Sequence, residues 1–278
     1  MKLYDDTATK ISKVVTTSYS TSFSMATEML DKKHRDAIYA IYGFVRIADE
    51  IVDTFHEFNK KELLDKFESD LKDALTQGIS LNPILHSFQI VVKEYGIPYQ
   101  YIDAFLTSMK YDLNKKHYEN KLEADTYIYG SADVVGLMCL RIFTDGNEAQ
   151  FNELKKPAMK LGSAFQKVNF LRDLKNDTEE LGRTYFPHIV NGGFNEECKL
   201  KIIEDIESDF REAFEGIKQL PKSTRIAVLS AYYYYIELLL KIKNTPAKRI
   251  MVSRVRISDF KKIRLLLKAQ VLCKLNRL

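Results

Sequence analysis

The chain has 278 residues, 45% hydrophobic and 29% charged, which is enough to bury a substantial core in an ordinary globular protein. Its net charge of +4 is too small to indicate nucleic-acid binding. Three widely spaced cysteines (Cys139, Cys198 and Cys273) favour neither a disulfide scaffold nor a zinc site and are typical of a reducing cytoplasm.

Glycine and proline are sparse, and apolar residues recur at spacings of three and four, which predicts an all-α protein. Asp31 is expected to cap one helix, and the first helical region is expected to break near Thr16–Ser24. No repeat or low-complexity linker divides the chain, so residues 1–278 are predicted to form one domain. The expected helices span residues 3–29, 31–55, 60–77, 82–95, 98–115, 124–145, 148–181, 197–218, 222–243 and 258–275.

The second expected helix carries two aspartates, Asp49 and Asp53, in the sequence RIADEIVD. Residues four apart share a helix face, where two like charges cost a few tenths of a kcal/mol unless solvent or a cation relieves them. Mg²⁺ prefers carboxylate oxygens and bridges to phosphate, and Arg46, one turn earlier, could hold a phosphate directly. Taken alone, this common spacing favours a simple exposed acidic face.

Tyr129–Leu140 (YGSADVVGLMCL) is small and apolar on nearly all sides, as in a buried helix. Its small residues would leave room beside it for either another helix or a ligand, and both interpretations stay open. The small residues are Gly130, Ser131, Ala132 and Gly136.

A second polar stripe lies in Gln166–Pro187, where Gln166, Asn169, Asp173 and Asp177 are spaced by three, four and four residues. Such side chains are poor core residues, but their oxygens are the ligands that hard cations prefer. Together, the two acidic pairs predict a site that holds a polyanion through divalent cations.

Other catalytic signatures are missing from the sequence. The five histidines form neither HxxxH nor HExxH, and no GxSxG, Walker loop or GxGxxG motif occurs. The run Tyr232–Tyr235 is expected to serve mainly in packing. Surface or packing roles are also predicted for the histidines, which are His34, His56, His86, His117 and His188.

The C-terminal segment is strongly basic: residues 241–278 contain twelve Lys or Arg and one acid, Asp259. Within Arg249–Arg277, an apolar face could lie on anionic lipid, although a last bundle helix with a solvated basic face explains the pattern equally well. No apolar run approaches the ~20 residues of a membrane span, so a soluble or at most peripheral protein is expected. The proposed apolar face comprises Ile263, Leu266, Leu267 and Leu275.

At these residues the sequence resembles the squalene/phytoene synthase family of head-to-head prenyl synthases, and most closely its bacterial phytoene synthases. The resemblance covers nearly the whole chain. It rests on Ser20–Phe23 (STSF), Tyr42–Asp53 (YGFVRIADEIVD), Tyr127–Gly130 (YIYG), Gln166–Asp177 and Gly182–Pro187 (GRTYFP), and it ends with Tyr235 and Arg254.

The resemblance implies a single-domain isoprenoid-synthase bundle around a central cavity, with Phe23, Tyr127 and Tyr235 lining the cavity. Catalytic roles are implied for Asp49, Asp53, Asp173, Asp177, Arg46, Arg172 and Tyr127. Magnesium is expected at Asp49, Asp53, Asn169, Asp173 and Asp177. Substrate contacts are expected from Ser20, Phe23, Tyr42, Gln166, Arg183, Tyr185, Tyr235 and Arg254. Lys175 and Asn176 depart from the acidic pattern of many phytoene synthases, so Asp173 is better supported than Asp177.

The implied reaction joins two prenyl diphosphates, most simply two geranylgeranyl diphosphates, to give phytoene through a cyclopropyl-carbinyl diphosphate. The alternative uses two farnesyl diphosphates and yields dehydrosqualene, or squalene if NADPH supplies hydride. Mg²⁺ is the expected cofactor, with Mn²⁺ as a substitute, and NADPH is not expected for phytoene. The expected location is the cytoplasm, with peripheral contact at the inner membrane. A membrane-associated helical binding or assembly protein of the same fold is the non-enzyme alternative.

Overall fold

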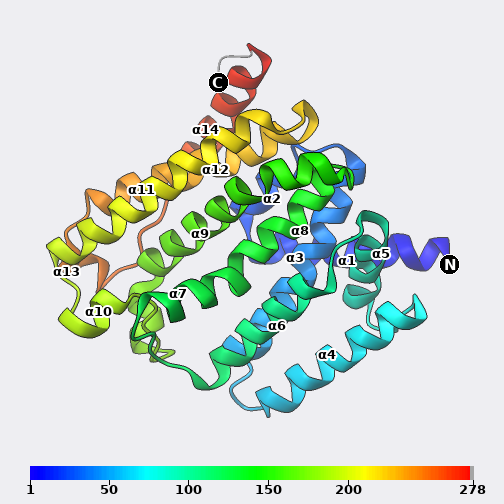
Figure 1. Cartoon of the computed structure of the whole chain (residues 1–278), viewed down its shortest axis with the longest axis horizontal. Coiled ribbons are helices and arrows are strands. Elements are labelled where there is room, and N and C mark those ends of the chain that lie inside the picture. The colour runs from blue at the N-terminus through cyan, green and yellow to red at the C-terminus, as the bar shows by residue number, and fades with distance from the viewer. Residues whose placement is uncertain (276–278) are drawn as a thin grey trace.

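A computed structural model describes residues 1–275, and over these residues the chain is all-α, as predicted (Figure 1). In chain order the elements are α1 (Lys2–Tyr19), α2 (Thr21–Thr27), α3 (Lys32–Asp53), α4 (Lys60–Gln77), α5 (Pro83–Tyr95), α6 (Tyr99–Asn114), α7 (Lys121–Ile128), the π-helical turn η1 (Tyr129–Asp133), α8 (Val134–Phe143), α9 (Glu148–Glu179), α10 (Pro187–Gly192), α11 (Glu196–Gln219), α12 (Lys222–Lys243), α13 (Ala247–Ile250) and α14 (Asp259–Lys274).

Local sequence signals fix many of the helix ends. The Asp31 carboxylate accepts a hydrogen bond from the His34 backbone N–H at 3.1 Å and caps α3, as predicted. Gly78 and Gly96 end α4 and α5 with φ of 73° and 60°, a left-handed conformation that favours glycine. The predicted break in the first helical region falls at Ser20, between α1 and α2.

The expected single helix over 124–145 is wrong in detail, because η1 separates α7 from α8. Gly130 in this turn lies against α6: a Cβ atom there would come within 2.1 Å of Ser108 Oγ and 2.5 Å of the Ala104 carbonyl oxygen. The close approach of two backbones therefore accounts for this glycine. The short helices α10 and α13 were not predicted. α10 begins at Pro187 and α13 follows Pro246, and in both cases proline fixes the entry of the helix.

Helix α9 crosses the middle of the molecule, with α11 and α12 on one side and α6, α7 and α8 on the other (Figure 1). Two apolar clusters of buried side chains meet along it, and partly buried Leu161 and Tyr232 pack against both. Helix α3 packs against α1, α5, α6 and α8. Within the described residues, no helix is both long enough and apolar enough to span a bilayer.

Candidate active site

The first acidic pair lies on the last turns of α3. The apolar face of α3, which includes Phe44, Ala48 and Val52, is buried. Asp49 and Asp53 therefore lie along the border of the core. Arg46 donates a hydrogen bond from Nη1 to Asp49 Oδ2 at 2.8 Å. Burial, followed by repulsion from Asp53, raises the pKa of Asp49 to about 7.

The second acidic pair lies on α9, toward its C-terminal end. Asp173 is paired with two arginines: Arg172 Nε donates to Asp173 Oδ1 at 3.0 Å, and Arg254 Nε lies 2.6 Å from the same oxygen. Burial, followed by repulsion from Asp173 and then Asp53, raises the pKa of Asp177 to about 8. Arg183 joins the two pairs, because its Nη1 donates to Asp53 of α3 at 2.7 Å and its backbone N–H donates to the Asp177 carbonyl of α9 at 2.6 Å. The two acidic pairs therefore lie close together.

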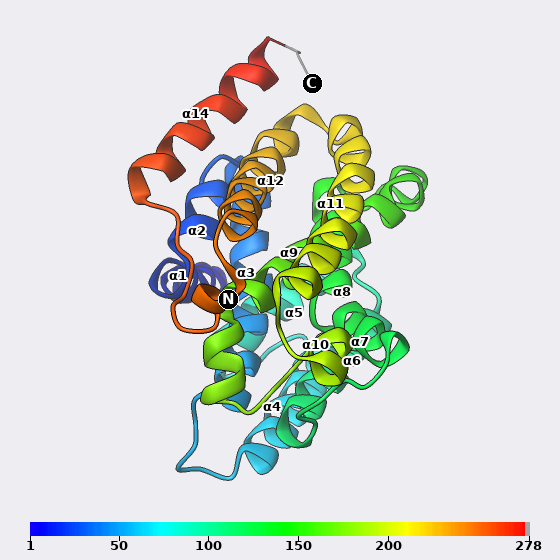
Figure 2. The same cartoon turned by 90° about the vertical axis from the view of Figure 1, so that its left-hand side faces the viewer.

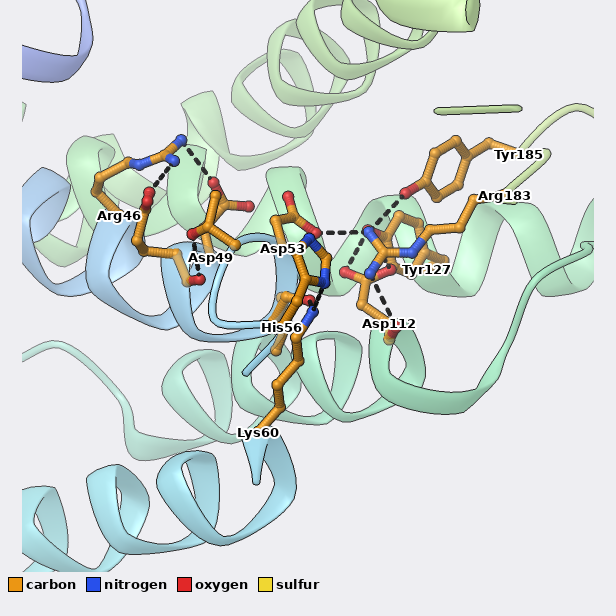
Figure 3. A network of polar contacts seen from close by, with 12 residues as sticks. Arg46, Asp49, Asp53, His56, Lys60, Asp112, Tyr127, Arg183 and Tyr185 are labelled. Carbon is orange, nitrogen blue, oxygen red and sulfur yellow. Dashed lines mark hydrogen bonds and ion pairs between the residues drawn. The ribbon is translucent and has the colours of Figure 1, made fainter. Parts of the chain in front are cut away.

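Arg183 links the first pair to a buried network (Figure 3). Its Nη1 donates to Asp53 Oδ1 at 2.7 Å, and its Nη2 donates to the Asp112 backbone carbonyl at 2.8 Å. Tyr127 donates its hydroxyl to Asp112 Oδ2 at 2.8 Å, and its ring stacks on that of Tyr185, with the centroids 5.2 Å apart. Arg183 is therefore held in place by a carboxylate and a carbonyl group before any ligand arrives.

Asp112 is a site residue that the sequence reasoning missed. It lies on α6 in register with buried Phe105, Ser108 and Met109, so a charged side chain on an otherwise buried helix face was the available signal. Burial raises the pKa of Asp112 to about 7, although the Arg183 guanidinium opposes this shift. One of its oxygens, Oδ1, is buried without a hydrogen-bond donor among the described residues.

A cavity of about 310 Å³ begins one helical turn from both acidic pairs. Val45 of α3 and Asn169 of α9, each four residues before an aspartate, contribute to its lining. The Tyr235 hydroxyl donates to Asn169 Oδ1 at 3.2 Å, and the Tyr235 ring stacks on Phe165 at a centroid distance of 3.9 Å. Asn169 is therefore oriented by an aromatic side chain from α12.

The rest of the lining is mostly apolar and comes from α2, α3, α8, α9, α11 and α12. Phe23 and Tyr42 stack at a centroid distance of 4.8 Å, which joins α2 to α3 at the cavity wall, and Ser20 caps α2 just before Phe23. Gln166 also lies in the lining, whereas Arg183 and Tyr185 lie outside it.

The predicted position of Tyr127 in the cavity is wrong. Its side chain is buried in the Arg183 network instead, where its hydroxyl donates a hydrogen bond to Asp112 of α6 and its ring stacks on that of Tyr185. Both interpretations of the small-residue segment hold in part. Gly130 serves close helix packing, whereas Ser131, Ala132 and Gly136 line the cavity.

The donor set suits a hard divalent cation. Four carboxylates and the Asn169 amide face each other across α3 and α9, and two of the carboxylates have raised pKa values caused by burial and by carboxylate neighbours. Among the described residues, no three His, Cys, Asp or Glu side chains are grouped to hold one ion together. Each helix thus offers a pair of ligands, and Mg²⁺ usually binds one or two carboxylates while waters and phosphate oxygens complete its shell.

Comparisons with known proteins identify the family of the chain. The family model described as squalene/phytoene synthase matches residues 16–261. The chain is 29% identical over 260 residues to chloroplastic phytoene synthase of an Oncidium hybrid cultivar, an alignment that covers 86% of this chain and 63% of that protein. It is 28% identical to chloroplastic phytoene synthase 2 of Solanum lycopersicum, covering 86% of this chain and 84% of that one. The chain thus spans less than two thirds of the length of several curated relatives, including the Oncidium protein.

Solved structures show the same fold. A dehydrosqualene synthase determined in complex with a ligand superposes with a TM-score of 0.84 at 23% identity, covering 97% of this chain and 98% of that one. A squalene synthase from Alicyclobacillus acidocaldarius gives a TM-score of 0.76 at 19% identity, covering 91% of this chain and 97% of that one.

Proposed function

Because this chain belongs to the squalene/phytoene synthase family, we propose that it catalyses the head-to-head condensation of two prenyl diphosphates. The observation that carries the proposal is that two acidic pairs face each other one turn beyond the polar end of an apolar cavity. A diphosphate group would lie among the aspartates and arginines, and its prenyl chain would enter the cavity.

The chain's own residues would bind and orient the leaving group. Arg46, Arg172 and Arg254 already contact the aspartates, so their guanidinium groups lie where a diphosphate would be held. The aspartate pairs and Asn169 would hold Mg²⁺, with Mn²⁺ as a substitute. When bound, the metal supplies positive charge that polarises the departing diphosphate. Arg183, fixed by Asp112, would orient Asp53.

The proposed reaction has two ionisations. The C1–O bond of one substrate breaks, and diphosphate leaves with the bonding electrons to give an allylic cation. The double bond of the second substrate attacks this cation, and loss of a proton closes the ring of a cyclopropyl-carbinyl diphosphate. Its C–O bond then ionises, rearrangement joins the two C1 carbons, and loss of another proton gives the hydrocarbon. The apolar cavity would exclude water from these cations, and the rings of Phe23, Tyr42 and Tyr235 could stabilise them.

We further propose geranylgeranyl diphosphate as the substrate and phytoene as the product. Leu154 and Asn169 both line the cavity and lie fifteen positions apart on α9, so the cavity extends about 22 Å along this helix. A geranylgeranyl chain has one isoprene unit more than a farnesyl chain and reaches further along such a cavity. The longer chain therefore fills the cavity better, and the likeness to phytoene synthases supports the same choice.

We also propose that residues 1–278 act as one domain in the cytoplasm, with peripheral contact at the inner membrane. Two apolar clusters that share Leu161 and Tyr232 support one domain. Three free cysteines, Cys139, Cys198 and Cys273, suit a reducing compartment.

Incubation of the full chain with Mg²⁺ and either C15 or C20 diphosphate, with and without NADPH, tests the proposal. Phytoene from the C20 substrate without NADPH is the expected product, identified by mass. Dehydrosqualene from the C15 substrate alone would support the same chemistry with the shorter chain, and squalene would require NADPH. If neither substrate releases diphosphate, and Asp173→Ala behaves like the wild type, the binding or assembly role replaces catalysis.

A further inference from the structure

Helix α14 presents an apolar stripe to solvent. Its inner face packs on α12 through buried Ala269 and half-buried Cys273. The outer stripe has spacings of three, four and four residues, so its members share one face of the helix. Their exposed fractions are 80% for Phe260, 50% for Ile263, 55% for Leu267 and 54% for Val271. An unbroken row of large apolar side chains on the surface indicates a contact with something apolar.

This stripe differs from the predicted apolar face. Ile263, Leu267 and Leu275 are exposed as expected, but Leu266 is half-buried and lies away from the stripe, which contains Phe260 and Val271 instead. The end of the basic segment at residues 276–278, including Arg277, lies outside the described residues.

Basic side chains flank the stripe on one side. Lys261, Arg264 and Lys268 line a groove of about 520 Å³ whose apolar lining includes Leu265 and Leu272. Lys261 pairs with Glu237, which also lines the groove, and the Lys268 ammonium lies 4.5 Å from the centroid of the Tyr233 ring. A cationic rim beside apolar side chains matches an amphiphile with an anionic headgroup and a hydrocarbon chain.

The helix also lies over part of the cavity wall. α14 is an outer helix that stands beyond α12 and α2 (Figure 2). Gln270 Nε2 reaches Met29 Sδ at 3.0 Å, which ties α14 to the residues that follow α2. Helices α2 and α12 themselves form part of the cavity wall through Phe23, Ala26 and Ala231. α14 thus lies over the outside of the wall that these helices share.

We propose that α14 docks the protein on the surface of an anionic phospholipid bilayer. The helix lies parallel to the surface, with Phe260, Ile263, Leu267 and Val271 among the lipid chains and the basic flank at the level of the phosphates. A second copy of the chain is a poorer occupant, because a twofold contact through this face would bring the same basic flanks together. Docking would let a hydrocarbon product pass into the bilayer, and this purpose rests on the proposed function. Vesicle binding itself can be measured without turnover.

Vesicle sedimentation of the full chain without substrate tests the docking. Vesicles of phosphatidylcholine with phosphatidylglycerol should bind the protein, and vesicles of phosphatidylcholine alone should bind it at least roughly 10-fold more weakly. The double variant Phe260→Ser/Leu267→Ser should lose binding to both. Arg264→Gln/Lys268→Gln should lose roughly 10-fold or more on the anionic vesicles alone, since each basic residue near such a surface contributes to binding.

Matched variants far from α14 serve as controls. Leu81→Ser/Leu122→Ser removes two side chains that are 95% and 77% exposed, and Lys61→Gln/Lys66→Gln removes two charges from α4, on the opposite side of the molecule (Figures 1 and 2). Both should bind anionic vesicles like the wild type, and every variant should retain the helical circular-dichroism spectrum.

Two results would overturn the docking proposal. One is a wild-type protein that stays in the supernatant with anionic vesicles. The other is an α14 variant that binds as the controls do; if Leu267→Ser instead turned a dimer into a monomer, a second copy would be the occupant. Product formation from detergent-dispersed substrate reports on the proposed function separately, because that assay contains no bilayer and α14 lies outside the cavity lining.

Discussion

Helix α9 carries two charged regions that differ in how their carboxylates are balanced. Facing α11, Lys160 and Lys167 each place Nζ 2.6 Å from an oxygen of Asp209, and Lys167 also pairs with Asp205. This group is called the lysine cluster. Burial lowers the pKa of Lys167, but its bonds to Asp205 and Asp209 outweigh burial and raise it. In the candidate active site on the same helix, Asp177 has instead a pKa raised to about 8 by burial and by neighbouring carboxylates.

The contrast separates two uses of buried charge. In the lysine cluster, each carboxylate has an ammonium partner, so the cluster joins α9 to α11 and needs nothing further. In the candidate active site, Asp49, Asp53 and Asp173 are paired with arginines, whereas the Asp177 carboxylate forms no ion pair with any of the described residues, which leaves a buried carboxylate suited to an added cation. Substitutions in the first region should therefore change stability, and substitutions in the second should change activity.

The largest expected effect is on turnover in the candidate active site. Asp49→Ala or Asp173→Ala should lower turnover by roughly 10²–10³-fold or more, as for loss of a group that stabilises developing charge. Circular dichroism should show the wild-type helical spectrum, because the change relieves crowding among like charges. Asp65→Ala on α4, which removes an exposed carboxylate paired with Lys61, is the control and should leave turnover unchanged. Near-normal activity in either site variant would contradict the two-pair arrangement.

The lysine cluster should respond in the opposite way. Lys167→Met leaves buried Asp209 with only Lys160, and breaking a buried ion pair should lower the free energy of unfolding by about 3 kcal/mol. The melting temperature should then fall by roughly 6–10 °C, while turnover per folded molecule below that temperature stays at the wild-type value. Lys201→Met, which removes an exposed pair with Glu197 on α11, should leave the melting temperature close to the wild-type value, because exposed ion pairs add little to stability. Equal melting temperatures for the two variants would remove the distinction between the regions.

Asp112 lies between these two cases, since it touches Arg183 rather than the site where substrate would bind. Asp112→Asn keeps the shape and the backbone carbonyl that accepts from Arg183 Nη2, but it removes the carboxylate charge whose Oδ1 lies 3.7 Å from Arg183 Nη1. The loss of this buried charge pair should lower kcat by roughly 10-fold. With a pKa of about 7, Asp112 loses its charge as the pH falls. Wild-type activity should therefore fall below about pH 7.

If Asp112 positions Arg183, Asp112→Asn should shrink this acid limb, and the part that remains belongs to Asp49 and Asp177, whose pKa values are also raised. Tyr127→Phe should have a smaller effect in the same direction, because it removes only the hydroxyl that donates to Asp112. Asp125→Asn, at an exposed carboxylate that pairs with Lys121, is the matched control and should keep the wild-type profile. An unchanged acid limb in Asp112→Asn would assign that limb to another group.

The sequence was sufficient for features that depend on one helix at a time. Helical periodicity and the Asp31 cap predicted most element boundaries, and the motif resemblance predicted the family that the comparisons confirm. Contacts between helices were harder to predict from the sequence. Arg183 and Asp53 are 130 residues apart, and the predicted position of Tyr127 was wrong because no periodicity reveals that its hydroxyl meets Asp112 of another helix. Which side chains meet is decided by packing between elements, and a single sequence records that only indirectly.

The smallest expected effect is on the pH dependence of the free energy of unfolding, in which Asp177 of the candidate active site can be compared with Asp133, a buried carboxylate near the lysine cluster. Burial raises the pKa of Asp177 to about 8 and that of Asp133, which accepts a hydrogen bond from Ser163, to about 7. Both values lie above those of an unfolded chain, so between about pH 4 and pH 8 the folded protein binds more protons than the unfolded one. In a solution kept free of metal by EDTA, the free energy of unfolding should therefore fall as the pH rises through this window.

Calorimetry of Asp177→Asn and Asp133→Asn should show that both substitutions flatten this dependence by similar amounts, so the response to metal is what distinguishes the two carboxylates. Added Mg²⁺ with inorganic diphosphate should raise the melting temperature of the wild type more at about pH 8 than at about pH 6, since it binds the ionised carboxylates. Asp133→Asn should keep this response, because its carboxylate lies on η1 beside Ser163 and away from the acidic pairs. Asp177→Asn should lose most of it. An equal metal response in the two variants would mean that the raised pKa of Asp177 reflects burial alone and has no bearing on cation binding.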